Sequence, residues 1–211
     1  VNQEIYDALL LLQHRGQDST GIATAEPSGV FHITKARGQV REAFRTRDMR
    51  SLLGTIGLGH VRYATKGTAS SEEEAQPFYV NAPYGIVLVH NGNLTNTREL
   101  TDELFHKDRR HLNTSSDTEL LVNVLAGELQ ATVSGLDLEP DEIFEAVSRV
   151  HARVEGSYAA IALIAGHGLL AFRDPFGIRP LILGTRKAPD GSFEWDVSSE
   201  SLVLENGEFE V

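Results

Sequence analysis

Two apolar segments of the chain each end in polar groups that could act on a small polar substrate. The segment Thr55–Arg62 ends in an arginine, and the planar guanidinium of Arg62 could bind a carboxylate through two parallel hydrogen bonds. The segment Gly85–His90 runs into Asn91 and Gly92, whose side-chain amide and backbone N–H could together stabilise a developing oxyanion. Structural interpretations stay open for both: Arg62 as a solvated charge at a strand end, and Asn91-Gly92 as a tight hairpin turn.

Two further polar segments lie next to elements with a regular hydrophobic pattern. His14–Gly21 lies between a helix and a strand and includes Arg15 and Gly16, and it could be an ordinary polar loop. Asp117 stands at the start of an apolar helix. The plainer interpretation makes it the N-cap of that helix, and the sharper one pairs its carboxylate with a substrate ammonium. These segments form one candidate site if the fold brings them together.

The hydrophobic pattern predicts the elements that must position these residues. Helices are expected over Asn2–Gln13, Val40–Leu53, Thr95–Phe105, Asp117–Leu129 and Pro140–Val154. Strands are expected over Gly21–Ala25, Val30–Lys35, Thr55–Arg62, Gly85–His90, Ser157–Ala165, Gly168–Arg173, Pro180–Gly184 and Phe193–Ser198, and Leu202–Glu208 is typical of a further strand and turn. Short turns favour antiparallel pairing of the late strands. Strands, then helices, then strands indicate a single α+β domain built in layers.

Composition excludes several classes of function. The formal net charge is −11, from 19 Lys and Arg against 30 Asp and Glu, so we expect neither nucleic acid nor a membrane surface as a partner. No apolar run approaches the roughly 20 residues that span a bilayer. The sequence contains no cysteine, which excludes disulfides, thiolate metal sites and a cysteine nucleophile within residues 1–211. The histidines form no H-E-x-x-H pattern, and we expect no metal site.

Six segments, in order along the chain, carry a family resemblance. They are Leu12–Asp18 with Gly21-Ile22, Gly59–Thr65, His90–Leu94, Thr114–Glu119, Gly156–Tyr158 and Arg173–Leu181. Together they resemble the glutaminase domain of class II glutamine amidotransferases, which use an N-terminal nucleophile (Ntn). Within this family, Gln13–Asp18 and Arg173–Leu181 point to the member of purine biosynthesis. The resemblance covers nearly the whole chain, from Asn2 to about Glu200.

The resemblance implies a fold and a set of substrate contacts. The fold would be a four-layer αββα Ntn-hydrolase sandwich with two mainly antiparallel sheets. Arg62, with Thr65 nearby, would bind the α-carboxylate of glutamine, and Asp117 would bind its α-ammonium group. A cation and an anion at a fixed separation suit glutamine, which is a zwitterion. Arg15 and Gly16 would line the pocket near the nucleophile.

For the whole protein, the resemblance implies hydrolysis of glutamine to glutamate and ammonia through a cysteinyl thioester. Asn91 and Gly92 would form the oxyanion hole. A second, phosphoribosyltransferase domain would transfer the ammonia to phosphoribosyl pyrophosphate, giving 5-phosphoribosylamine at the first step of purine synthesis. The glutaminase domain would need no cofactor, the second domain would need Mg²⁺, and an iron–sulfur cluster elsewhere in the protein is left open. The expected protein is a cytoplasmic homo-oligomer.

The chain departs from the family pattern at both ends. Mature members begin with Cys-Gly-Ile and a short apolar strand, whereas Val1-Asn2-Gln3 aligns just after that strand. We therefore expect residues 1–211 to be a glutaminase domain that lacks its Cys-bearing strand, is interrupted near residues 201–202 and is inactive by itself. We also expect no phosphoribosyltransferase domain within residues 1–211. Two alternatives stay open: a non-catalytic binding or assembly module, and a class II amidotransferase with another ammonia acceptor.

Overall fold

The strands form two antiparallel sheets and a separate hairpin. The computed structural model describes residues 1–63, 72–133, 135 and 137–211. The first sheet has the strand order β2-β1-β3 and the second the order β4-β5-β6-β7, while β8 and β9 pair with each other. The strands are β1 (Ser19–Ala25), β2 (Phe31–Arg37), β3 (Ile56–Arg62), β4 (Phe78–Val80), β5 (Ile86–Leu94), β6 (Gly156–Ile164), β7 (Gly168–Arg173), β8 (Ile182–Lys187) and β9 (Phe193–Ser198).

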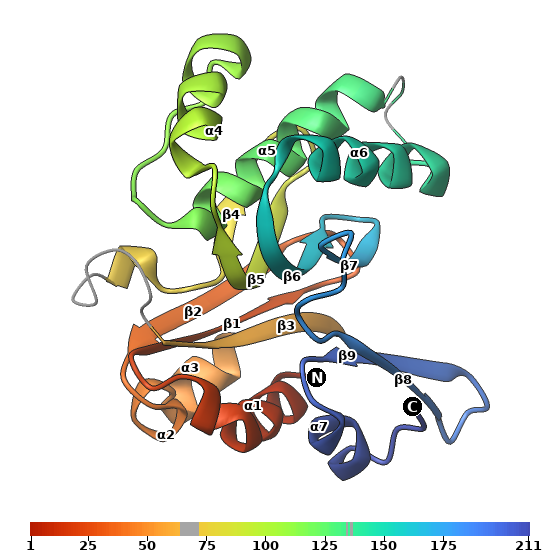
Figure 1. Cartoon of the computed structure of the whole chain (residues 1–211). Coiled ribbons are helices and arrows are strands. Elements are labelled where there is room, and N and C mark those ends of the chain that lie inside the picture. Colours follow the sequence, from red (N-terminus) through yellow and green to blue (C-terminus); the bar gives the residue numbers. More distant parts are fainter. Residues whose placement is uncertain (64–71, 134, 136) are drawn as a thin grey trace.

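The helices cover the outer faces of the two sheets (Figure 1). They are α1 (Asn2–Leu11), α2 (Val40–Ala43), α3 (Thr46–Ser51), α4 (Thr97–Glu103), α5 (Asp117–Thr132), α6 (Pro140–Arg153) and α7 (Ser201–Asn206), with short 3-10 or π-helical turns at Leu12–Arg15, Glu72–Glu74 and Leu104–Asp108. Helices α5 and α6 lie on the second sheet, and α1 lies on the first. None of the helices in the described ranges is long and apolar enough to cross a membrane.

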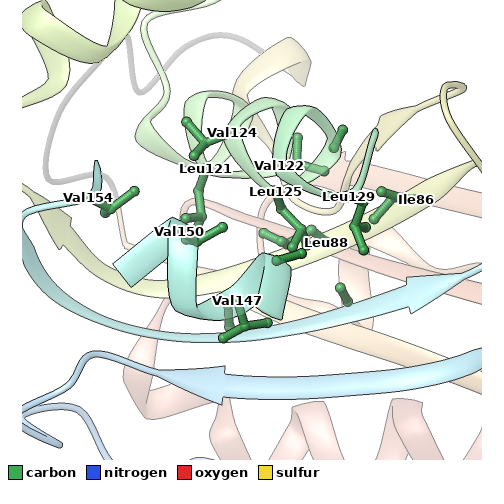
Figure 2. Close-up of a cluster of buried hydrophobic side chains, with 14 of the residues drawn as sticks. Ile86, Leu88, Leu121, Val122, Val124, Leu125, Leu129, Val147, Val150 and Val154 are labelled. Atoms are coloured by element: carbon green, nitrogen blue, oxygen red, sulfur yellow. The ribbon is translucent and has the colours of Figure 1, made fainter. Parts of the chain in front are cut away.

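Three hydrophobic clusters define the layers. The largest fills the space between the second sheet and α5 and α6, where Leu88, Leu121 and Val150 meet (Figure 2). A second cluster lies between the two sheets and includes Leu58 of β3 and Val89 of β5, among others. The third packs α1 against the first sheet. The two sheets therefore face each other, with helices outside, and β3 contacts β5 where the sheets meet.

The expected α+β fold with antiparallel sheets is confirmed, but two predicted elements were wrong. Val40–Leu53 is not one helix, because Phe44 takes an extended conformation and the Arg45 N–H donates to Asp48 Oδ2 at 3.0 Å, which starts α3 afresh. Leu202–Glu208 is not a strand and turn: residues 202–206 belong to helix α7, in which Leu204 is buried beside Gly184 of β8. The three-residue strand β4 was not predicted, and the late strands pair antiparallel in two separate sheets.

Asn91-Gly92 does not form the hairpin turn that an isolated Asn-Gly pair indicates. Strand β5 continues through both residues, with Asn91 opposite Ala159 and Gly92 opposite Tyr158 of β6. Gly92 has φ of 149°, and a side chain there would overlap the carbonyl oxygen of Ser157. Only glycine fits this conformation easily. The glycine is therefore explained by a strand position with positive φ that lies close to the backbone of β6, and not by a turn.

Candidate active site

A cavity of about 300 Å³ opens at the ends of β3 and β5. It is bounded by the residues after α1, by the first residue of α5, and by Arg179 and Ser199 on either side of the β8–β9 hairpin. The fold therefore brings together segments that are far apart in the sequence. Five of the seven predicted site residues line the cavity: Arg15, Arg62, Asn91, Gly92 and Asp117. Thr65 lies outside the described residues.

Arg62 is the last residue of β3, and its side chain is only 10% exposed. Its Nη2 donates to Glu74 Oε2 at 3.2 Å, and the other oxygen of Glu74 accepts a hydrogen bond from Ser115 Oγ at 3.0 Å. The interpretation of Arg62 as a solvated charge at a strand end is therefore wrong. A buried, ion-paired guanidinium at a cavity wall is well placed to bind a carboxylate.

Asp117 is the first residue of α5 but not its N-cap. The cap is Ser116, whose Oγ accepts from the N–H of Thr118 at 3.3 Å. The carboxylate of Asp117 accepts from the N–H of Leu94 at 3.3 Å and lies 3.8 Å from Nδ1 of His90. Because another residue caps the helix, the Asp117 carboxylate remains available at the cavity.

A side chain fixes the backbone of β5 just before Asn91 and Gly92. Nε2 of Gln76 donates to the carbonyl oxygen of His90 at 3.0 Å, and the N–H of His90 donates to Oε1 of Gln76 at 2.6 Å. This amide makes the pair of bonds that a neighbouring strand would make. Asn91 and Gly92 are thus presented at the cavity by a strand whose backbone is held on this side by Gln76.

The two histidines beside the cavity are uncharged near neutral pH. Burial, with His90 and Arg62 nearby, lowers the pKa of His60 to about 3. Burial also lowers the pKa of His90, although the negative charge of Asp117 opposes this shift. Neither ring therefore supplies a positive charge, and arginines provide the positive charge at the cavity. In the part of the chain that the structure describes, no cluster of three His, Asp or Glu residues could hold a metal ion.

Arg15 and Gly16 connect the cavity to the helix that covers the first sheet. Nη1 of Arg15 donates to Oε1 of Glu200 at 2.7 Å, and His14 contacts the same oxygen at 3.0 Å. Gly16 lies behind Arg62 and not on the cavity wall: a Cβ there would come within 2.5 Å of the Arg62 carbonyl carbon. Gly16 therefore allows the backbone of Arg62 to pack closely.

Sequence reasoning did not assign Glu74, Gln76 or Arg179 to the site. Arg179 lines the cavity, and its Nε is buried without a hydrogen-bond partner among the described residues. The turn before it is ordered by Asp174, whose carboxylate accepts from the N–H groups of Phe176, Ile178 and Arg179. The run Arg173–Leu181 was a visible signal for Arg179. Glu74 belongs to an ordinary-looking acidic run, and nothing local marks its role.

Comparison with known proteins places the chain in a family. A family model described as "Glutamine amidotransferase domain" matches residues 60–204. The amidophosphoribosyltransferases of Pasteurella multocida and Escherichia coli are each 53% identical, over 100% and 97% of this chain and 41% and 40% of their own length. The enzyme of Saccharomyces cerevisiae is 44% identical over 99% of this chain and 41% of its own length. The chain spans about 40% of these curated relatives.

Solved structures agree with this assignment. The glutamine phosphoribosylpyrophosphate amidotransferase of B. subtilis, complexed with ADP and GMP, superposes with a TM-score of 0.78 at 29% identity, covering 99% of this chain and 41% of that chain. A protein of Pseudomonas aeruginosa described as a "predicted glutamine amidotransferase" shares the fold, with a TM-score of 0.54 at 16% identity over 87% of this chain and 72% of its own. The cavity with its opposite charges lies largely within the matched family region, and the chain belongs to the glutamine amidotransferase domain family.

Proposed function

We propose that the chain is the glutaminase domain of an amidophosphoribosyltransferase. It would hydrolyse glutamine to glutamate and ammonia, and the ammonia would react with phosphoribosyl pyrophosphate in a second domain to give 5-phosphoribosylamine, the first step of purine biosynthesis. The observation that carries the proposal is one cavity that presents Arg62, Asp117, Asn91 and Gly92 together. The names of the relatives support the choice of ammonia acceptor.

Two residues of opposite charge would select the amino-acid part of glutamine. Arg62 binds the α-carboxylate, with Thr65 as a second contact, and Asp117 binds the α-ammonium group. Because the neighbouring histidines carry no charge, Arg62 and Asp117 meet the zwitterion without a further cation from either ring. Arg15, held by Glu200, lines the same cavity.

The bond-breaking steps need a thiolate and two hydrogen-bond donors. A cysteine thiolate attacks the side-chain carbonyl carbon of glutamine, and the carbonyl oxygen becomes an oxyanion that the Asn91 amide and the Gly92 N–H stabilise. The intermediate collapses: the C–N bond breaks, the amide nitrogen takes up the proton that the thiol had given to the N-terminal amine and leaves as ammonia, and a thioester remains. Water then attacks the thioester carbonyl carbon and gives one proton back to the amine; the C–S bond breaks, which releases glutamate and regenerates the thiolate. Residues 1–211 contain no cysteine, and on the family resemblance the proposed thiol would lie in a segment before Val1 in a longer protein.

We further propose that this preceding segment forms a strand between β3 and β9 and so completes an Ntn-type αββα sandwich. Among the described residues, β3 pairs with β1 alone and β9 with β8 alone, and the cavity reaches from β3 to Ser199 after β9. One face of the hairpin also carries exposed apolar side chains, at Leu183, Phe193 and Trp195. A strand paired with the edges of β3 and β9 would continue this apolar face and bring its first residue to the cavity. The interruption near residues 201–202 stays a prediction.

The remaining proposals concern the whole protein. On the family resemblance, Mg²⁺ would act with phosphoribosyl pyrophosphate in the second domain, the glutaminase domain would need no cofactor, and the protein would be a cytoplasmic homo-oligomer. These properties depend on segments beyond residues 1–211.

The deciding experiment is an assay of the full-length protein for ammonia and glutamate release from glutamine, with and without phosphoribosyl pyrophosphate and Mg²⁺. We expect release of both products, pyrophosphate formation when the second substrate is present, and loss of activity when the N-terminal cysteine is replaced by alanine. Glutamine hydrolysis without pyrophosphate formation would indicate another ammonia acceptor. Glutamine binding without hydrolysis would overturn catalysis and favour a binding module.

A further inference from the structure

Arg62 belongs to a chain of polar contacts that leads away from the cavity, buried at Arg62 and Glu74 and reaching the surface at Ser115. Its guanidinium contacts Glu74 Oε2 at 3.2 Å, and Glu74 Oε1 accepts from Ser115 Oγ at 3.0 Å. The side chain of Glu74 is 6% exposed. Because both carboxylate oxygens have a partner, Glu74 has little freedom to rotate, and Arg62 meets a fixed negative group.

The loop that carries Ser115 is itself held by a second buried carboxylate. Glu119, in the first turn of α5, accepts the N–H of Asn113 at 2.8 Å and both the N–H and Oγ1 of Thr114 at 2.7 Å. These three bonds tie residues 113–115 to the helix that begins at Asp117. The position of Ser115, and through it of Glu74, is therefore set by α5.

This connection links the two proposed recognition charges. Asp117 is the first residue of α5, and Arg62 is connected to the same helix through Glu74 and Ser115. The separation between the cation and the anion is thus built into one rigid unit. A ligand that needs both charges at a set distance gains affinity when neither has to be ordered on binding.

We infer that Glu74 is a positioning residue for glutamine recognition, acting through Arg62. The inference rests on the proposed function and adds a residue to it. Glu74 holds the long, flexible arginine side chain in the orientation that receives the α-carboxylate, and Ser115 fixes Glu74. A guanidinium has five N–H donors, so contact with Glu74 through Nη2 is compatible with a second carboxylate on the same group.

The test compares Glu74→Gln with Glu73→Gln in the full-length protein, assayed for ammonia release from glutamine. Both substitutions remove one negative charge from the same short helical turn, but Glu73 is exposed. For Glu74→Gln we expect the KM for glutamine to rise about tenfold and kcat to change by less than about twofold, because saturating glutamine restores occupancy. For Glu73→Gln we expect both constants to stay within about twofold of wild type.

Ser115→Ala keeps every charge and removes only the hydrogen bond to Glu74. We expect its KM to rise about threefold, and the double variant with Glu74→Gln to be no worse than Glu74→Gln alone, because the two residues act in series.

Several outcomes overturn the inference. A wild-type KM for Glu74→Gln in an active protein would do so while leaving the proposed function intact. A loss confined to kcat, accompanied by a lower melting temperature, would show a structural role only. Additive effects of Ser115→Ala and Glu74→Gln on the KM for glutamine would contradict the proposal that Ser115 acts through Glu74. An inactive wild-type protein would overturn the proposed function and this inference with it.

Discussion

Asp117 offers a test of recognition that is separate from helix capping. Asp117→Asn removes the negative charge and keeps an oxygen for the N–H of Leu94. We expect kcat/KM for glutamine to fall about 100-fold, because a hydrogen bond between charged groups contributes about 1.5–3 kcal/mol and 1.4 kcal/mol is a factor of ten. Steady-state ammonia release by the full-length protein measures the change.

The matched control is Ser116→Ala, which removes the cap and leaves the charge. It should lower the free energy of unfolding by about 1 kcal/mol and leave the KM for glutamine within about twofold. If Ser116→Ala and Asp117→Asn had the same kinetic effect, the carboxylate would be acting on the helix and not on the substrate.

A site residue could be predicted from the sequence when its role shows in its immediate neighbours, and not when its partners lie far away along the chain. Arg62, Asn91, Gly92 and Asp117 stand at the ends of apolar elements, where a polar residue is conspicuous, and the structure places all four at one cavity. Glu74 could not be found in this way, because its role rests on contacts 12 and 41 residues distant in the sequence. Without those partners, it is one of three successive glutamates in a polar segment.

At the scale of elements, the continuation of β5 through Gly92 should be sensitive to any side chain. Gly92→Ala combines a positive φ with overlap onto the backbone of β6, so we expect it to lower the free energy of unfolding by at least about 2 kcal/mol and to abolish glutaminase activity. Chemical denaturation and ammonia release measure the two effects. Gly166→Ala is the control: its φ is 76°, but nothing lies within 4 Å of a new Cβ, so it should cost only about 1 kcal/mol and leave activity unchanged. An equal loss of free energy of unfolding in Gly92→Ala and Gly166→Ala would contradict a specific role for the β5–β6 contact.

The elements that were predicted wrongly are those whose local pattern is overridden by distant packing. The short continuous apolar run Leu202-Val203-Leu204 is compatible with a strand, but Leu204 packs against Gly184 of β8, and this contact favours the helix. Within Val40–Leu53, the apolar spacing fits one helix, and the capping contact between Arg45 and Asp48 divides it. The long helices α5 and α6 were predicted well, because their hydrophobic faces extend over several turns.

At the scale of the whole molecule, the two histidines beside the cavity make stability depend on pH. His60 has a pKa of about 3 when folded, against about 6.5 when unfolded, so the unfolded state binds more protons between these values. Stability is therefore present above pH 6.5 and is lost as the pH falls towards 3, by up to about 1.4 kcal/mol per pH unit for each proton. His90, whose pKa is also lowered, adds to the loss. Urea denaturation between pH 7.5 and 5 measures how the free energy of unfolding changes with pH.

The variant His60→Asn isolates one of these groups. Below pH 6.5, the free energy of unfolding of this variant should fall less steeply with decreasing pH than that of wild type, by up to about 1.4 kcal/mol per pH unit, which corresponds to one proton. Above pH 7.5, the pH dependence should be the same as in wild type. An unchanged slope below pH 6.5 would mean that His60 titrates in the folded protein as it does in the unfolded chain.

Among the described residues, β3 and β9 each pair with one strand only, and these edges determine how residues 1–211 should behave when expressed by themselves. Unpaired strand edges beside exposed apolar side chains are templates for adding a further strand, including one from another molecule. Residues 1–211 expressed without the preceding segment should therefore self-associate as concentration rises. A peptide with the sequence of that segment, added in excess, should keep the domain monomeric in light scattering. The same strand addition would then supply the nucleophile and make the isolated domain soluble at high concentration.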